Sequence, residues 1–232
     1  MNKKIADLRM EMNKVIKGKD DIIVKIIMTV LASGHILLED NPGLGKTTLA
    51  KTFSKATSMQ DNRIQFTPDT MPSDILGYSM YNQREGKMEF VKGPVFTNLL
   101  LADEINRTSS KTQAALLEAM AEATATVDNV TYQLPKPFIT IATQNPITSG
   151  GTQALPDSQL DRFMVRLSMG YPDVQSQVEM LMEDVMYVIY DIFKHRLILT
   201  PSARREKNGA ENIIYDICQT TEAPSMAGER SN

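Results

Sequence analysis

The segment from Leu38 to Thr48 places two glycines, a lysine and two threonines at a spacing that suits phosphate binding. It follows an apolar run and precedes an amphipathic stretch, the strand–loop–helix setting that a phosphate-binding loop requires. Gly43 and Gly45 allow backbone N–H groups to turn inward around phosphate oxygens, and the helix N-terminus favours negative charge. The predicted nucleotide contacts are Asp40, Asn41, Pro42, Gly43, Leu44, Gly45, Lys46, Thr47 and Thr48.

Two residues of this loop have distinct predicted roles. Lys46 can reach the β- and γ-phosphates of ATP, and the Thr47 hydroxyl can bind Mg²⁺. Asp40 stands where the common pattern has its first glycine. The structural alternative for the whole segment is a tight turn with an exposed lysine.

A second chemical signal is the acidic pair at the end of the apolar run Leu99-Leu100-Leu101-Ala102-Asp103-Glu104. Side chains alternate along a strand, so Asp103 and Glu104 point in different directions and can do different jobs. We predict that Asp103 holds Mg²⁺, directly or through water, and that Glu104 orients the attacking water. By itself the pair could instead cap a following helix.

The elements that must position these residues alternate between short apolar runs and amphipathic stretches. Predicted strands cover 36–38, 63–66, 98–102, 138–143 and 163–167. Predicted helices cover 5–15, 20–31, 46–55, 110–122 and 173–196. This alternation predicts an α/β fold, a five-stranded parallel sheet between layers of helices.

Two predicted β-hairpins interrupt the alternation, one over 78–92 and one over 124–134 that turns at Asp128-Asn129. The final residues lack apolar periodicity and are predicted to be disordered. We therefore predict a core over 1–171, a short helical region over 172–219 and a tail over 220–232.

Composition narrows the class of protein. The net charge of −3 and the pI near 5.5 argue against nucleic acid as a partner, because a DNA-binding protein usually has a basic face. A single cysteine, Cys218, allows no intramolecular disulfide. The sequence shows neither a signal peptide nor an apolar run near the roughly 20 residues of a membrane helix. We expect a cytoplasmic protein that does not enter a membrane. His35 is expected to be a packed or capping residue, and no protein-bound metal beyond the Mg²⁺ of the nucleotide is expected.

Several motifs together resemble the MoxR family of AAA+ ATPases from about Val15 to Glu183. They are the loop at 38–47, the acidic strand and the helix after it at 99–120, and three shorter segments: Met71-Pro72-Ser73-Asp74-Ile75-Leu76-Gly77, Ala142-Thr143-Gln144-Asn145-Pro146 and Leu155-Pro156-Asp157-Ser158-Gln159-Leu160-Asp161-Arg162-Phe163. Asp40 in place of glycine is typical of that family.

The resemblance implies further roles. Asn145 matches sensor 1, which helps to position the hydrolytic water, although it could simply be a turn residue before proline. Arg162 matches the arginine finger that reaches a neighbouring subunit's γ-phosphate, although it could pair with Asp157 or Asp161. The turn around Ile16 and Gly18 matches the segment against the adenine, with an ordinary helix–helix turn as the alternative. The hairpins match two family inserts that line a pore or face a partner, and could also be mere decorations.

The C-terminal region departs from the family. The resemblance implies a helical lid with a sensor 2 arginine there, but the sequence has no such motif, and we predict that most of the lid is missing between about Asp184 and Val188. Arg204 and Arg205 could stand in for that arginine, but no motif supports either residue. A reduced lid predicts weaker nucleotide binding and exposed apolar surface.

The resemblance implies an ATPase that uses ATP and Mg²⁺ in a homo-oligomeric ring, a hexamer in this superfamily. It also implies chaperone-like maturation of other proteins, beside a partner with a von Willebrand factor A domain. One alternative is a regulatory nucleotide-binding module with little or no hydrolysis, because the lid is reduced. Another is a DNA-remodelling ATPase, against which the acidic pI counts.

Overall fold

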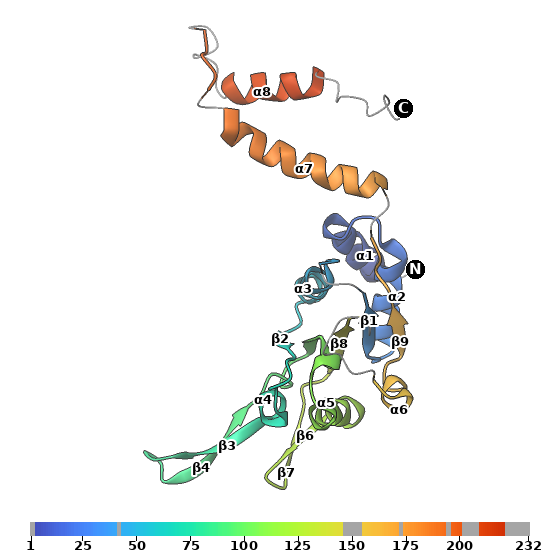
Figure 1. Cartoon of the computed structure of the whole chain (residues 1–232), viewed down its shortest axis with the longest axis vertical. Helices are drawn as coiled ribbons and strands as arrows, with labels where there is room; N and C mark the ends of the chain where they lie inside the picture. Colours follow the sequence, from blue (N-terminus) through green and yellow to red (C-terminus); the bar gives the residue numbers. More distant parts are fainter. Residues whose placement is uncertain are drawn as a thin grey trace, which may run out of the picture. The chain divides into compact units, whose positions relative to one another are not determined.

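The structure is a computed structural model, and it describes residues 3–40, 43–145, 155–171, 174–193, 196–200 and 209–220. The chain divides into two compact units, Met1–Pro172 and Asp173–Asn232. The first unit contains the α/β core and the second contains two helices (Figure 1).

A five-stranded sheet forms the centre of the first unit, in the order β2-β5-β8-β1-β9. Its strands are β1 (Ile36–Glu39), β2 (Asp61–Gln65), β5 (Leu99–Asp103), β8 (Ile139–Gln144) and β9 (Val165–Leu167). All neighbouring strands are parallel, so their carboxyl ends meet at one edge. The predicted α/β class and five-stranded parallel sheet are confirmed.

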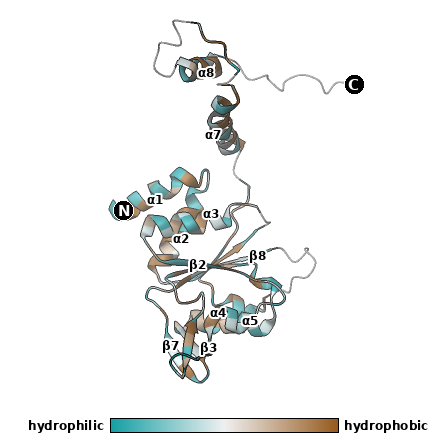
Figure 2. Cartoon of the chain, turned by 90° about the vertical axis from the view of Figure 1, so that its left-hand side faces the viewer, coloured by the Kyte–Doolittle hydropathy of each residue, from teal (hydrophilic) through white to brown (hydrophobic). Residues whose placement is uncertain are grey.

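Helices cover both faces of this sheet (Figure 2). One face packs against α1 (Lys3–Val15), α2 (Asp20–Leu31) and α3 (Lys46–Thr57), and the other against α4 (Pro72–Leu76) and α5 (Ser110–Glu122). Alternate residues of one strand enter different cores: Leu37 packs with the α4–α5 side, whereas Ile36 and Leu38 pack with the α1–α3 side. This explains why the central strands carry apolar residues on both of their faces.

Two antiparallel hairpins project from the α4–α5 side, as predicted. One joins β3 (Gly77–Asn82) to β4 (Lys87–Lys92), and the other joins β6 (Thr124–Val127) to β7 (Val130–Gln133). Asp128 and Asn129 both have positive φ, 49° and 63°, the geometry of a two-residue hairpin turn. The rings of Phe90 and Tyr132 stack at 4.0 Å, so the two hairpins support each other.

Short helical elements adjoin the strand ends. The 3₁₀ turn η1 (Ile105–Arg107) follows β5, and α6 (Asp157–Leu160) precedes β9. η1 follows the predicted acidic pair, and α6 precedes the predicted arginine finger Arg162. The helical form of these two segments was not predicted.

In the described part of the second unit the structure has the helices α7 (Val174–Phe193) and α8 (Gly209–Thr220). Helix α7 runs without a break through 184–188, the place where the lid was predicted to be shortened. Arg204, Arg205, His195 and the tail from 221 lie outside the described residues. Among the helices that the structure describes, none combines the length and the apolar character that crossing a membrane requires.

His35 is a buried structural residue at the start of β1. Its Nδ1 accepts the backbone N–H of Thr140 at 3.0 Å, and its Nε2 lies 3.0 Å from the carbonyl oxygen of Met120, to which it donates. The neutral ring therefore satisfies both partners. Burial lowers the pKa of His35 below its usual 6.5, although the Met120 carbonyl opposes this shift.

This geometry predicts that acid destabilises the fold through His35. Between the lowered folded pKa and the unfolded value near 6.5, the unfolded chain binds the proton more strongly, so stability is lost as pH falls below about 6.5. Exchanging His35 for alanine should cost about 2–4 kcal/mol, because a cavity and two unpaired backbone groups remain. It should also flatten the fall in melting temperature between about pH 7.5 and 5.5. Equal slopes in thermal unfolding of both proteins would contradict the assignment.

Candidate nucleotide-binding and catalytic site

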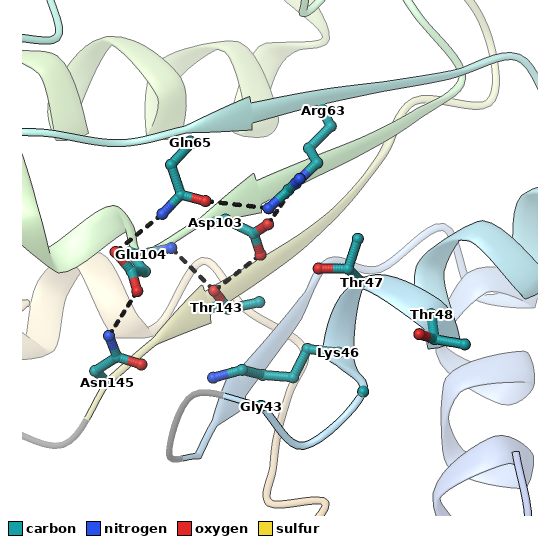
Figure 3. Close-up of a pocket in the computed structure, with 11 residues that line it drawn as sticks. Gly43, Lys46, Thr47, Thr48, Arg63, Gln65, Asp103, Glu104, Thr143 and Asn145 are labelled. Atoms are coloured by element: carbon teal, nitrogen blue, oxygen red, sulfur yellow. Dashed lines mark hydrogen bonds and ion pairs between the residues drawn. The ribbon is translucent and has the colours of Figure 1, made fainter.

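A cavity of about 360 Å³ opens where the carboxyl ends of β2, β5 and β8 meet the loop between β1 and α3. Figure 3 shows the lining side chains converging from these elements. The lining residues are Gly43, Gly45, Lys46, Thr47, Thr48, Arg63, Gln65, Asp103, Glu104, Thr143 and Asn145. Most of the residues predicted to bind nucleotide, to hold Mg²⁺ or to act on water are therefore brought together.

The loop before α3 has the backbone of a phosphate cradle. Gly43 and Gly45 have φ of +88° and +80°, a backbone conformation that residues with a Cβ atom rarely adopt. No atom lies within 4 Å of a Cβ added at either glycine, so their requirement is conformational, and the space beside them is open to a ligand. Helix α3 then begins at Lys46, with its N-terminus at the cavity.

Lys46 lies in the cavity as a desolvated cation. Its Nζ donates to the carbonyl oxygen of Asp40 at 2.8 Å. Burial lowers the pKa of Lys46, and the negative charges of Asp40, Asp103 and Glu104 only partly counter this effect. A phosphate would supply the missing negative charge, so the residue is electrostatically prepared for an anion.

The Asp40 carboxylate binds other parts of the chain, and its contact with the nucleotide stays a prediction. Its carboxylate accepts hydrogen bonds from the Ser168 hydroxyl at 2.8 Å and from the backbone N–H groups of Met169 and Gly170. It is buried and does not line the cavity. The carboxylate that replaces the common glycine therefore fastens the start of the loop to the turn after β9, while its carbonyl holds Lys46.

Asp103 ends β5 with both carboxylate oxygens occupied. Oδ1 accepts the Thr143 hydroxyl at 3.2 Å, and Oδ2 accepts Arg63 Nε at 2.7 Å (Figure 3). The Asp103 side chain is only 8% exposed, so its charge sits in a poorly solvated position that favours a cation.

Glu104 adopts a left-handed backbone conformation with φ of 59°, unusual for a residue other than glycine. Its backbone N–H donates to the Thr143 hydroxyl at 2.9 Å, which helps to hold this strained geometry. The consequence is that the Glu104 carboxylate turns toward the cavity beside Asn145 instead of continuing the line of β5.

Three donors hold the Glu104 carboxylate. Asn145 Nδ2 donates to Oε1, and Gln65 Nε2 and Arg107 Nη1 donate to Oε2, each at 2.9 Å. Burial tends to raise the pKa of Glu104, but the hydrogen bonds from Arg107, Asn145 and Gln65 and the charge of Arg107 outweigh it, and the pKa is lowered. The group is thus an ionised carboxylate, suited to orienting and polarising a water molecule.

Other predicted site residues lie elsewhere. Arg162 is exposed, donates to the Leu117 carbonyl oxygen at 3.4 Å, and does not line the cavity. Gly18 forms the α1–α2 turn with φ of +67°, and Ile16 is buried in the α1–α3 core. Neither lines the cavity, so their contact with adenine stays a prediction. Leu44 is also absent from the lining, and Asn41 and Pro42 lie outside the described residues.

Three lining residues were missed by sequence reasoning: Arg63, Gln65 and Thr143. Arg63 and Gln65 are polar positions two apart within the predicted strand 63–66, a signal that was present in the sequence. It could not be read without knowing that β2 lies beside β5, where Gln65 is opposite Asp103. Thr143 is on β8 and lies two residues before Asn145, which directly follows the strand, so strand alternation could have placed both on the same side.

The donor set fits a magnesium nucleotide. The cavity offers a backbone cradle at a helix N-terminus, the Lys46 ammonium, the Thr47 hydroxyl and the Asp103 carboxylate, which are the groups that hold phosphate and Mg²⁺ in nucleotide-binding loops. Mg²⁺ bound there would neutralise charge on the phosphate oxygens.

Comparison with known proteins agrees with this site. Residues 35–165 match the model of the ATPase family associated with various cellular activities (AAA). The matched segment contains the cradle, the acidic pair and Asn145, and the chain therefore belongs to the AAA ATPases. Within that class it is a MoxR-family protein: it is 41% identical over 171 residues to Chaperone MoxR1 of Mycobacterium tuberculosis.

Two other relatives cover more of the chain. The uncharacterised protein YeaC of Bacillus subtilis is 50% identical over 225 residues, covering 92% of this chain and 70% of YeaC. A crystal structure of a Cytophaga hutchinsonii protein assigned as an ATPase superposes with a TM-score of 0.69 at 38% identity, covering 94% of this chain and 64% of the other. The match to MoxR1 covers 74% of this chain but only 45% of MoxR1. The chain thus spans about half to two thirds of these relatives.

Proposed function

We propose that this chain binds Mg-ATP in the cavity at the carboxyl ends of the sheet and hydrolyses it as part of an oligomer, to drive remodelling or maturation of partner proteins. The observation that carries the proposal is the convergence of Lys46, Thr47, Asp103, Glu104 and Asn145 on one cavity. Membership of the MoxR family supports ATPase activity at the level of the class.

The site divides the work of phosphoryl transfer among its residues. The cradle and Lys46 would hold the phosphates, and Thr47 and Asp103 would hold Mg²⁺. Glu104 would orient a water molecule against the γ-phosphorus, with Asn145 fixing the Glu104 carboxylate through their 2.9 Å hydrogen bond. Positioning and charge stabilisation supply most of the rate in this chemistry, so a carboxylate of low pKa is adequate.

Arg162 would complete the site of a neighbouring subunit. It is exposed and outside its own chain's cavity, as expected for a residue that acts on another copy. An arginine placed against the γ-phosphate stabilises the charge of the transition state. A ring, a hexamer by family resemblance, would bring each Arg162 to the next cavity.

The proposed action on partner proteins is supported by the names of relatives. One of them is named a chaperone, which supports a chaperone-like role. The core is also similar to Midasin of Giardia intestinalis, at 27% identity over 158 residues, and to Midasin of Dictyostelium discoideum, at 32% over 140 residues. A partner with a von Willebrand factor A domain and a cytoplasmic location are retained from the sequence as parts of the proposal.

Mixing two inactive variants tests the proposal. Arg162→Ala leaves its own cavity intact, whereas Lys46→Ala disables its cavity but keeps Arg162. Each alone should lose Mg-ATP turnover by about 100-fold or more. Equimolar mixtures should recover roughly a quarter of wild-type turnover, because some intact cavities then face an intact arginine. Phosphate release, measured over a range of protein concentrations, gives the rates, and wild-type activity per subunit should rise with concentration.

The control is a mixture of Arg162→Ala with Arg162→Ala/Lys46→Ala, which should recover nothing. Two results together would contradict the action of Arg162 in trans. The mixture of Arg162→Ala with Lys46→Ala would recover no turnover, and wild-type turnover per subunit would not depend on protein concentration. ATP binding without turnover at every concentration would instead favour the regulatory module, and turnover that rises only with DNA would favour the remodelling ATPase.

A further inference from the structure

Arg63 is a cavity residue that the proposed mechanism does not use. It lies on β2, and its side chain is 48% exposed, whereas its partner Asp103 is 8% exposed. Arg63 Nε donates a hydrogen bond to Asp103 Oδ2 at 2.7 Å, so the guanidinium lies directly beside the carboxylate (Figure 3). Asp103 is thus paired with a cation from the chain itself, as Glu104 is with Arg107.

This contact occupies a carboxylate oxygen that a metal ion bound to Asp103 could use. The other oxygen of Asp103 accepts the Thr143 hydroxyl at 3.2 Å, so Oδ2 is the oxygen that faces a cation. A guanidinium at hydrogen-bond distance and a divalent ion would repel each other strongly at this oxygen. Binding of Mg²⁺ directly at Oδ2 therefore requires Arg63 to leave or retreat.

Arg63 also reaches the second acidic residue. Its Nη2 donates to Gln65 Oε1 at 3.2 Å, and Gln65 Nε2 donates to Glu104 Oε2 at 2.9 Å. A single line of hydrogen bonds thus joins Asp103, Arg63, Gln65 and Glu104 along the ends of β2 and β5. The half-exposed guanidinium can change place at small cost, because water replaces its lost contacts.

We infer that Arg63 stands in for Mg²⁺ at Asp103 when the metal is absent and is displaced when Mg-nucleotide binds. This inference rests on the proposed function, since it assumes that the cavity binds a magnesium nucleotide. Arg63 is a positioning residue in this scheme: it neutralises Asp103 so that the buried carboxylate neither destabilises the empty site nor repels incoming phosphate.

The scheme makes the effect of Arg63 depend on metal. Without Mg²⁺, removing the guanidinium exposes the phosphates to the charge of Asp103, which weakens nucleotide binding. With Mg²⁺ in excess, the metal neutralises Asp103 and Arg63 has already been displaced. The informative quantity is the ratio of the nucleotide Kd in EDTA to that in excess Mg²⁺.

The experiment measures binding of mant-AMPPNP, a fluorescent non-hydrolysable ATP analogue, to the full chain in EDTA and in excess Mg²⁺. For Arg63→Met the ratio should rise about three- to ten-fold above the wild-type ratio. Nearly all of the change should come from weaker binding in EDTA. Arg63→Lys, which keeps a cation on a long side chain, should stay close to wild type.

Arg9→Met is the matched control, because Arg9 forms a partly exposed ion pair with Asp20 between α1 and α2, outside the cavity. Its ratio should equal that of wild type. A ratio unchanged in Arg63→Met would overturn the inference, whether affinity falls equally in both conditions, as for a direct phosphate contact, or does not fall at all. Thermal unfolding checks that the variant folds, and Arg63→Gln replaces it if it does not.

The result is separable from the proposed function. Wild-type binding of the analogue, and its loss in Lys46→Ala, report on the cavity as a nucleotide site. Only the metal dependence of the Arg63 variants reports on the stand-in cation. Failure of Arg63→Met to change the ratio would thus leave the nucleotide site in place.

Discussion

Glu104→Gln should bind Mg-ATP within about three-fold of wild type yet hydrolyse it at least about 100-fold more slowly. The amide keeps the size of the side chain, but it lacks the charge that polarises water. The carboxylate is ionised in the folded protein, because its hydrogen bonds from Arg107, Asn145 and Gln65 outweigh the effect of its burial. Equilibrium binding and single-turnover hydrolysis with radiolabelled ATP separate the two effects.

Glu118→Gln is the matched control for this substitution. Glu118 is exposed on α5, outside the cavity, so its exchange should leave both binding and turnover unchanged. Normal turnover in Glu104→Gln would remove Glu104 from the proposed mechanism. Loss of binding would instead show that the site needs the Glu104 charge for its own arrangement.

Lys46→Ala is expected to lose ATP affinity by at least about 100-fold, because charge-assisted contacts to the β- and γ-phosphates disappear. The empty protein should lose little stability, since Lys46 is a desolvated cation and the one hydrogen bond found for its Nζ goes to the Asp40 carbonyl. A thermal-shift titration checks both statements. At ATP about 100 times the wild-type Kd, wild type should gain about 2.7 kcal/mol, and the variant should gain at most about 0.4 kcal/mol.

Lys25→Ala serves as the control, because Lys25 is an exposed residue of α2 that does not line the cavity. It should respond to ATP like wild type. A full ATP-induced shift in Lys46→Ala would be incompatible with the cradle as the nucleotide site.

The two exchanges examine different links between sequence and function. Lys46 acts through a loop whose geometry depends on local sequence, whereas Glu104 acts through contacts made across the sheet. A variant at Asp40 would probe a third link, because this residue connects the loop to the turn after β9.

Local sequence determined most of the fold and the central chemistry. Apolar runs and helical periodicity identified the five strands of the sheet and both hairpins, because burial and turn geometry leave a strong local pattern. The glycines, Lys46 and Thr47 were readable because a phosphate cradle is built from one continuous segment. Asp103 and Glu104 were readable because they end a strongly apolar strand.

Tertiary structure alone decided which side chains meet. Strand order places β2 beside β5, and only this brings Arg63 and Gln65 to the acidic pair. The left-handed backbone at Glu104 turns its carboxylate to Asn145, and the carboxylate of Asp40 binds a turn about 130 residues away. These contacts depend on loop closure and on sheet register, which join segments distant in sequence, and periodicity within one segment carries no information about them.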